Sequence, residues 1–347
     1  MNKSKVYFMR IKENTSVFIF VKDFLDKIDI LRYIKGNKLF LKINLISSEF
    51  VPGQCTSPIV LDAILSYLVE SNRKFDITVG DTDLAATCQC DKAAKVWGVL
   101  KIVKKYDVKF QNLAKDKLVE VNLNGEVLKK TFLPKVILET DSIISVPIIK
   151  THCLTKMTCA LKNMWGLLPR IRHQYHLIAD QVISDINMFI KEKLAFIVVD
   201  GTISMEGNGP RTGIPRVTNV LFGSNDPVAV DAAVARFMGL GLPEHILNAY
   251  KRGIGNLEYE IIGNNFYSEN FIPPDPDKQP IFKYEMMFRK SSLKPLFFNT
   301  FIFNILAWMA TKYNTFWYYR LKGKRYREKI LNEIWYKEEL LKYIEDK

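Results

Sequence analysis

The segment Leu39-Phe40-Leu41-Lys42-Ile43-Asn44-Leu45 decides the fold class, because it is a β-rich run of the kind found in buried strands. Thr56-Ser57-Pro58 follows it and supplies a cap and a proline at the first helical position, which predicts a helix through about Glu70. Residues Phe75 to Val79 then form a second β-rich run. A strand, a helix and a second strand in this order indicate a parallel sheet.

The same alternation continues along the chain to about residue 270. It predicts strands at 142–146, 194–199 and 217–222, and helices at 93–105 and 227–238. Asn124-Gly125, between the β-rich runs 119–123 and 127–129, predicts a tight hairpin. We therefore expect an α/β fold with a mostly parallel sheet and flanking helices, plus the α-helical tail described below.

The composition of the 347 residues is that of an ordinary globular protein, with 48% hydrophobic and 25% charged residues. It excludes a disordered chain, collagen and a disulfide-stapled mini-protein, and the lack of any run of about twenty apolar residues excludes a polytopic membrane protein. Five cysteines without a secreted-scaffold spacing, and a start too polar for a signal peptide, favour a reducing, cytoplasmic location.

A proline-rich segment divides the chain. Four prolines between 273 and 280 predict an extended linker (273–280) between an α/β body (1–272) and a helical tail (281–347). The tail is rich in aromatic residues and carries fourteen Lys and Arg against seven Asp and Glu. It therefore supplies +7 of the formal net charge of +13.

The stretch Leu296 to Thr311 is uncharged and is flanked by basic residues, which leaves three interpretations of the tail. A helix lying in the plane of an anionic membrane, at its inner face, would suit the basic rims and the aromatic residues. An amphipathic helix packed on the body or on a second subunit fits equally well. Nucleic acid is a less favoured partner, because no recognised binding motif accompanies the basic and aromatic residues.

Polar residues follow the predicted strands where those strands end, at the edge of a parallel sheet where ligands bind. They are Asn44, Asp81, Asp83, Lys150, His152, Asp200, Glu206 and Asp226. Lys150 and His152, with Lys162 and Asn163 on the next helical stretch, would hold a carboxylate or a phosphate. His152 would act as a general base or a metal ligand. The alternative is a solvated loop with a structural histidine.

Three further features leave alternatives open. Residues 170–176, which include His176, form either a basic lid over an anionic ligand or an exposed loop. The glycine-rich segment 200–210 either projects Glu206 and Asn208 toward a ligand or forms a surface hairpin. Asp226 is expected to cap a helix, whereas Asp231, among apolar helical residues, requires a partner such as Lys42 or Lys150.

Seven parts of the chain, taken in order between about residues 38 and 240, resemble the domain-of-unknown-function 362 family of iron–sulfur-centre-type proteins. They are Lys42-Ile43-Asn44, Thr56-Ser57-Pro58, Gly80-Asp81-Thr82, Ser145-Val146-Pro147 with Lys150-Thr151-His152, Ala160-Leu161-Lys162-Asn163, Asp200-Gly201 with Glu206-Gly207-Asn208-Gly209-Pro210, and Asp226-Pro227-Val228-Ala229-Val230-Asp231. The resemblance implies an α/β protein that works beside a ferredoxin-type protein. The pattern is also distantly similar to nickel-dependent lactate racemase, which implies proton or hydride chemistry beside a carboxylate.

The sequence leaves the cofactor unknown, with an iron–sulfur cluster and a divalent metal as the candidates. Cys88, Cys90, Cys153 and Cys159 would supply four thiolates. Their spacing matches no ferredoxin pattern, which favours scattered buried cysteines over a cluster or a zinc site. No set of ligands has a spacing that identifies a metal.

We expect an enzyme of redox type that acts on an anionic small molecule, with electrons supplied by a separate iron–sulfur protein. The expected catalytic residues are His152 and Lys150. The expected substrate-binding residues are Lys42, Asn44, Lys162, Asn163, Glu206, Asn208 and His176, and the orienting or metal-binding residues are Asp81, Asp83 and Asp231. The alternative is a non-enzymatic anion-binding module that its C-terminal tail docks to a membrane surface.

Overall fold

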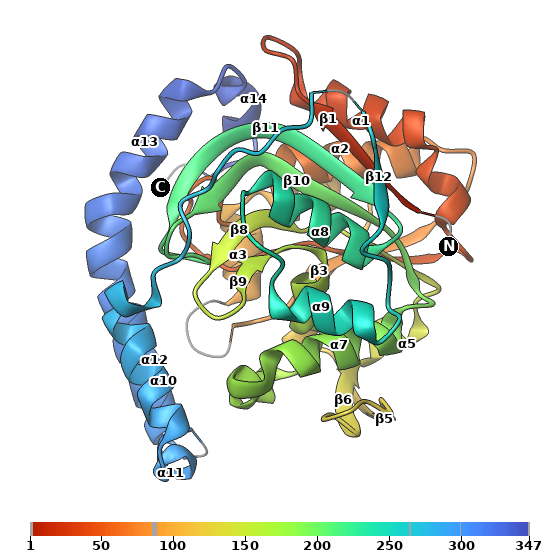
Figure 1. The fold of residues 1–347 in the computed structure, drawn as a ribbon. Helices are drawn as coiled ribbons and strands as arrows, with labels where there is room; N and C mark the ends of the chain where they lie inside the picture. The colour runs from red at the N-terminus through yellow and green to blue at the C-terminus, as the bar shows by residue number, and fades with distance from the viewer. Residues whose placement is uncertain (1–2, 85–88, 264, 299, 346–347) are drawn as a thin grey trace.

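The computed structural model describes residues 3–84, 89–263, 265–298 and 300–345, and one mixed sheet of ten strands lies at its centre (Figure 1). Eight strands follow one another across the sheet: β12 (Tyr259–Ile262), β1 (Ser4–Arg10), β11 (Ile214–Ser224), β10 (Leu194–Glu206), β7 (Ser142–Ser145), β2 (Lys38–Lys42), β3 (Asp76–Asp81) and β4 (Lys109–Asn112). The other two are β8 (Ile148–His152), which pairs with β10, and β9 (Lys156–Thr158), which pairs with β8.

The sheet is mostly parallel, as the alternation of strands and helices predicts. β2 pairs in parallel with β3 on one side and with β7 on the other. β4 pairs in parallel with β3, and β10 pairs in parallel with β7. β11 then runs antiparallel to both β10 and β1. The parallel strands place their carboxyl ends at one edge of the sheet.

Helices cover both faces of the sheet and enclose two cores. One core includes α1 (Val17–Ile28), α2 (Pro58–Val69), α3 (Cys90–Val96) and α4 (Val99–Lys105). The other includes α5 (Lys135–Glu139), α6 (Ala160–Asn163), α7 (Ala179–Ile190), α8 (Pro227–Phe237) and α9 (Glu244–Lys251). Leu39 and Leu41 of β2 enter the first core and Phe40 enters the second, because side chains alternate across a strand. The fold is thus α/β.

The helix predicted at 93–105 is two helices, α3 and α4. Gly98 separates them with a φ of 69°, a left-handed conformation that an uninterrupted helix does not contain. The helix predicted from Pro58 is confirmed, with Ser57 as its N-cap and the proline at its start. Asp226 also caps α8 as expected, since its carboxylate accepts hydrogen bonds from the amides of Val228 and Ala229.

The predicted hairpin forms, but its turn is longer than Asn124-Gly125 alone. β5 (Leu118–Asn122) and β6 (Lys130–Pro134) pair so that Asn122 lies opposite Lys130. The buried Asp185 carboxylate accepts hydrogen bonds from the amides of Glu126 (2.8 Å), Val127 (3.2 Å) and Leu128 (2.8 Å). These contacts fasten the connecting residues to α7.

The glycine-rich segment 200–210 belongs to a hairpin, which β10 and β11 form with Glu206 opposite Ile214, but its first part is a buried strand and not a loop on the surface. β10 continues through Gly201 to Glu206, with a change of register between Gly201 and Ile203. Its partner β11 is long enough to pair with it over this whole length. Glu206 therefore ends a buried strand.

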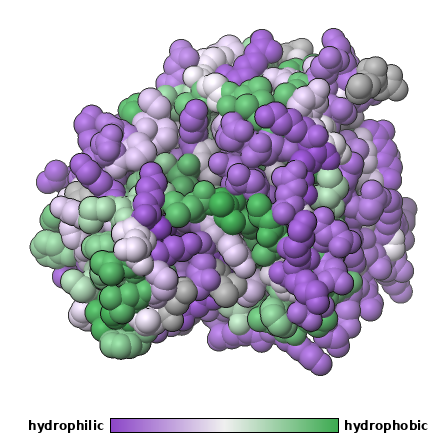
Figure 2. Space-filling model, turned by 60° about the horizontal axis from the view of Figure 1, so that its bottom comes forward, coloured by the Kyte–Doolittle hydropathy of each residue, from purple (hydrophilic) through white to green (hydrophobic). Residues whose placement is uncertain are grey.

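The tail is helical, as predicted. Its elements are α10 (Pro280–Lys290), α11 (Lys294–Phe298), α12 (Ile302–Asn314), the π-helical η6 (Thr315–Gly323), α13 (Lys324–Glu333) and α14 (Lys337–Leu341). Its end packs into the first core, where Ile330, Tyr336 and Leu340 are buried. Before this, α10–α12 lie along one side of the body (Figure 1), where hydrophobic residues gather on the molecular surface (Figure 2). None of the helices in the described ranges is both long and apolar enough to cross a membrane.

Candidate functional site

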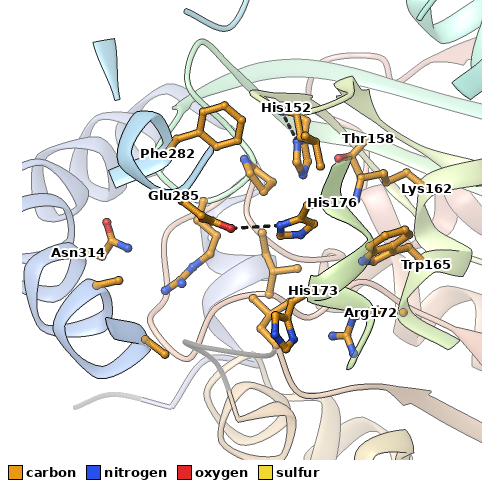
Figure 3. A pocket seen from close by; sticks show the side chains of 18 of the residues that line it. His152, Thr158, Lys162, Trp165, Arg172, His173, His176, Phe282, Glu285 and Asn314 are labelled. Atoms are coloured by element: carbon orange, nitrogen blue, oxygen red, sulfur yellow. Dashed lines mark hydrogen bonds and ion pairs between the residues drawn. The ribbon is translucent and has the colours of Figure 1, made fainter. Parts of the chain in front are cut away.

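A cavity of about 680 Å³ lies at the carboxyl ends of β2, β3 and β8, where a parallel sheet predicts a ligand site (Figure 3). The body supplies its polar floor, which includes Lys42, Asp81, Lys150, His152, Lys162 and Arg172. The tail helices α10–α12 supply a mainly apolar roof, which includes Phe282, Phe288, Phe298, Phe303, Leu306 and Tyr313. The tail therefore completes a site that begins in the body.

Hydrogen bonds join four of the predicted site residues on the floor. Lys150 Nζ donates to Asn44 Oδ1 (2.6 Å), and Asn44 Nδ2 donates to Asn163 Oδ1 (3.2 Å). Asn163 Nδ2 then donates to the carbonyl oxygen of Lys42 (3.0 Å). Residues from three separate parts of the chain are thus held in one fixed arrangement.

Lys42 and Asp81 form a buried ion pair at the ends of the adjacent strands β2 and β3. Lys42 Nζ lies 2.6 Å from Asp81 Oδ1, and both side chains are almost fully buried. Asp81 also accepts hydrogen bonds from the amides of Leu45 (2.6 Å) and Thr82 (2.8 Å). The positive charge of Lys42 is therefore matched by protein groups before any ligand binds.

Lys150 is different, because it is fully buried and forms no ion pair with a carboxylate in the described part of the chain. Besides Asn44, its Nζ donates to the carbonyl oxygen of Gln54 (2.8 Å). Burial lowers the pKa of Lys150 to about 7. This amine consequently changes its protonation state near neutral pH.

Lys162 and Arg172 add two more cations to the floor. Lys162 Nζ lies over the Trp165 ring at 5.0 Å, and burial together with the charge of Arg172 lowers its pKa to about 8. Among the described residues, none forms a hydrogen bond or an ion pair with Lys162. Arg172 donates to the carbonyl oxygens of Leu168 (3.0 Å) and Asp83 (2.5 Å).

Three histidines line the cavity, and burial lowers the pKa of each, which favours the neutral imidazole. His152 Nδ1 accepts a hydrogen bond from the Leu154 amide (3.0 Å). A neutral His152 therefore carries its proton on Nε2 and is a hydrogen-bond donor there. His173 stacks on Phe303 of α12, with ring centroids 4.0 Å apart.

The roof carries one charged group of its own, formed by Glu285 and Arg289 of α10. Arg289 donates to Glu285 Oε1 through Nε (2.9 Å) and Nη2 (2.7 Å), and His176 Nδ1 lies 3.2 Å from the same oxygen. Burial disfavours the charge on Glu285, but these contacts outweigh it and lower its pKa to about 2. His176 thus links the body to the roof, and the segment 170–178 (η4, Arg170–Ile178) is not an exposed loop.

Two buried polar atoms at the cavity lack a hydrogen-bond partner among the residues that the structure describes: Thr158 Oγ1 and Arg289 Nη1. Leaving such an atom unpaired in a folded protein costs about 1–3 kcal/mol. Both residues line the cavity, Thr158 from the floor and Arg289 from the roof. A bound polar ligand would satisfy them.

The structure places four of the predicted site residues outside the cavity lining. Asp83 accepts hydrogen bonds from the Cys90 amide (2.7 Å) and from Asn112. Glu206 pairs with Arg216 (2.9 Å), and Asn208 Oδ1 accepts a hydrogen bond from the amide of Asp275 (2.7 Å). These contacts fasten loops and the 273–280 segment to the body.

Asp231, the fourth, does not pair with Lys42 or Lys150, so that expectation is wrong. Its carboxylate accepts hydrogen bonds from the amides of Ala160 (2.7 Å) and Leu161 (3.0 Å). Burial raises the pKa of Asp231 to about 7 against the effect of these amides. Asp231 therefore fastens the start of α6, which carries Lys162 and Asn163, to α8.

The described cysteines do not form one cluster. Cys90 lies in the first core and Cys159 in the second, on opposite faces of the sheet, and Cys153 lies after β8. Cys88 lies outside the described residues. Within the described ranges, no group of three or more His, Cys, Asp or Glu side chains could hold a metal ion. The donor set therefore does not fit an iron–sulfur cluster bound by these cysteines.

Sequence reasoning did not identify the roof of the cavity, nor Thr158 and Trp165 on its floor. One signal was present for the roof. Glu285 is the single acidic residue between 281 and 327, and Arg289 follows it at the i,i+4 spacing of helical pairs. An isolated carboxylate in a basic, apolar tail indicates a specific contact, here with His176 and Arg289.

Comparisons with known proteins give relatives and solved structures to which this chain is similar. A thylakoid-associated protein of Synechocystis sp. is 24% identical over 212 residues, which are 59% of this chain and 64% of that protein. The chain thus spans less than two thirds of that relative. The lactate racemase apoprotein of Thermoanaerobacterium thermosaccharolyticum aligns with a TM-score of 0.47 at 11% identity, over 69% of this chain and 58% of the other. A Thermotoga maritima protein aligns with a TM-score of 0.39 at 13% identity, over 70% and 59%.

The two structural alignments are too weak for an argument about chemistry. The family comparison is stronger, since the model described as "Domain of unknown function (DUF362)" matches residues 39–236. This range contains every floor residue named above, from Lys42 to Arg172, and ends before the linker and the tail. The chain therefore belongs to the DUF362 family.

Proposed function

We propose that this protein is an enzyme that acts on an anionic small molecule with an apolar portion, bound in the cavity between the body and the tail. The polar floor would hold the anionic group, and the aromatic roof would cover the apolar portion. Pockets of about 300–1,000 Å³ with an apolar lining and a few polar groups are typical of small-molecule sites.

The observation that supports this proposal most directly is the charge of the floor. Lys150, Lys162 and Arg172 form no ion pair with a carboxylate in the described ranges, whereas Lys42 is paired with Asp81. Lys150 and Arg172 are buried and Lys162 is half-buried, and burying a charge without a partner is costly. A ligand carboxylate or phosphate beside these three residues would remove that cost.

The chemistry we infer is proton transfer on the bound anion. A pKa of about 7 allows the Lys150 amine to take up or release a proton at neutral pH, which suits a general acid or base. His152 is assigned to hydrogen bonding through Nε2, because its Nδ1 accepts from a backbone amide. The expected redox reaction and the separate iron–sulfur partner stay predictions, since they depend on the family resemblance alone.

The test is calorimetric titration of the full chain with decanoate, which has a carboxylate and an apolar chain. We expect decanoate to bind more tightly than decanol, which lacks the charge, and than acetate, which lacks the chain. Lys162→Gln should weaken decanoate binding about tenfold or more, because a hydrogen bond to a charged group contributes roughly 1.5–3 kcal/mol.

Lys283→Gln is the matched control, since Lys283 is exposed on α10 and does not line the cavity. It should leave the affinity for decanoate unchanged. Equal affinities for decanoate and decanol, or an unchanged affinity in Lys162→Gln, would contradict the proposal.

A further inference from the structure

The helices that roof the cavity also present apolar side chains to solvent. Phe301, Trp308 and Phe316 are 72%, 61% and 62% exposed, and Ile305, which is 49% exposed, lies between the first two. Phe301, Ile305 and Trp308 follow one another at spacings of four and three residues, and Phe316 follows Trp308 after eight, so these side chains lie on one side of α12 and its continuation η6. Leu293 and Leu296, near the start of α11, are also exposed.

The other face of α12 is also apolar, since Phe303, Leu306 and Ala310 line the cavity. A helix on the surface of a water-soluble protein normally has one apolar face and one polar face. Hydrophobic residues gather at this side of the molecule in the space-filling view (Figure 2). An exposed apolar face of this kind marks an interaction surface.

The charge of the same segment is entirely positive. Residues 286–327 contain nine Lys and Arg and no Asp or Glu. Lys290, Lys312, Arg320, Lys322, Lys324 and Arg325 are exposed. Two of these amines lie close to tryptophan rings, Lys312 at 5.8 Å from the Trp308 centroid and Lys322 at 4.2 Å from that of Trp317. The surface thus combines apolar side chains with a basic rim.

We propose that this docking surface, α11–α12 and η6 with their basic rim, binds the surface of an anionic lipid bilayer with its helices in the membrane plane. Exposed Phe, Trp, Leu and Ile would enter the boundary between headgroups and acyl chains, and the Lys and Arg residues would contact anionic headgroups. This inference is independent of the ligand in the cavity.

Charge favours a bilayer over other occupants. The same face of a second copy would carry the same positive charge, so two copies would repel each other there. Nucleic acid would match the charge and stack on the exposed aromatic rings, but it would leave aliphatic side chains such as Ile305 and Leu296 uncovered, whereas acyl chains cover both kinds of side chain.

The test is flotation of the full chain with vesicles of phosphatidylcholine containing 30% phosphatidylglycerol. We expect binding at low salt that weakens as salt is raised, and binding to pure phosphatidylcholine that is at least about tenfold weaker. Phe301→Ser with Trp308→Ser and Phe316→Ser should reduce binding to the anionic vesicles at least about tenfold. Arg320→Gln with Lys322→Gln and Lys324→Gln should remove most of the salt dependence.

The matched control is Ile19→Ser with Phe132→Ser, two apolar residues of the body with comparable exposure, which should leave vesicle binding unchanged. Circular dichroism confirms that each variant is folded. Three outcomes would overturn the proposal: equal binding to neutral vesicles, unchanged binding by the Phe and Trp variant, or a dimer in solution that this variant converts to a monomer.

Discussion

Replacing Asp81 by Ala is expected to lower the free energy of unfolding by about 3–5 kcal/mol, the usual cost of removing one partner of a buried ion pair. The change would leave the Lys42 ammonium buried without its partner at 2.6 Å. It would also leave the amides of Leu45 and Thr82 without their acceptor. Chemical denaturation of the full chain measures the loss.

Asp76→Ala is the control, because Asp76 begins the same strand β3 that Asp81 ends, and it also pairs with a lysine. The Asp76–Lys109 pair is exposed, and such pairs contribute about 0–1 kcal/mol. If both variants lose a similarly small free energy of unfolding, the Lys42–Asp81 pair is not buried, contrary to the structure. A loss in Asp81→Ala that Lys42→Met reverses in the double variant would confirm that the cost comes from the unpaired ammonium.

The sheet and the floor of the site could be predicted from the sequence because both depend on local pattern. Short apolar runs that end in polar residues define parallel strands, and the carboxyl ends of those strands meet at one edge. This reasoning predicts Asn44, Asp81, Lys150 and His152 at that edge, and all four line the cavity.

What the sequence did not show depends on contacts between distant residues. From the sequence, the Asp231 carboxylate fits an ion pair with a lysine as well as hydrogen bonds to the amides at a helix start. It accepts from the amides of Ala160 and Leu161 because α8 packs against α6. The roof lies more than one hundred residues after the floor along the chain, beyond a proline-rich segment that suggested a separate tail. Sequence periodicity cannot reveal such pairings.

The exposed tail helices and the cavity are parts of one arrangement. Phe303 and Leu306 of α12 face the cavity, whereas Phe301 and Trp308 of the same segment are exposed. If both proposals hold, a bilayer on the docking surface would lie one helix away from the bound anion. An amphiphilic substrate would then have a short path from lipid to the floor.

Lys150→Met is expected to weaken decanoate binding at pH 6 about thirtyfold or more, since removing one partner of a buried charge pair costs roughly 2–5 kcal/mol. The pKa of about 7 gives the reason for choosing this pH. Below pH 7 the amine is an ammonium that attracts the carboxylate, and above pH 7 it is neutral. Wild-type affinity should therefore fall as the pH rises from 6 to 9, measured by calorimetry.

The pH profile distinguishes a direct role of Lys150 from a structural one. In Lys150→Met the fall in affinity near pH 7 should disappear, and the fall that remains should lie near pH 8, where Lys162 loses its proton. Lys162→Gln should show the reverse, keeping the fall near pH 7. If Lys150→Met binds decanoate weakly but keeps the whole wild-type pH profile, Lys150 only supports the shape of the cavity. If Lys150 contacts the anion, its replacement must remove the fall in affinity that its own deprotonation causes.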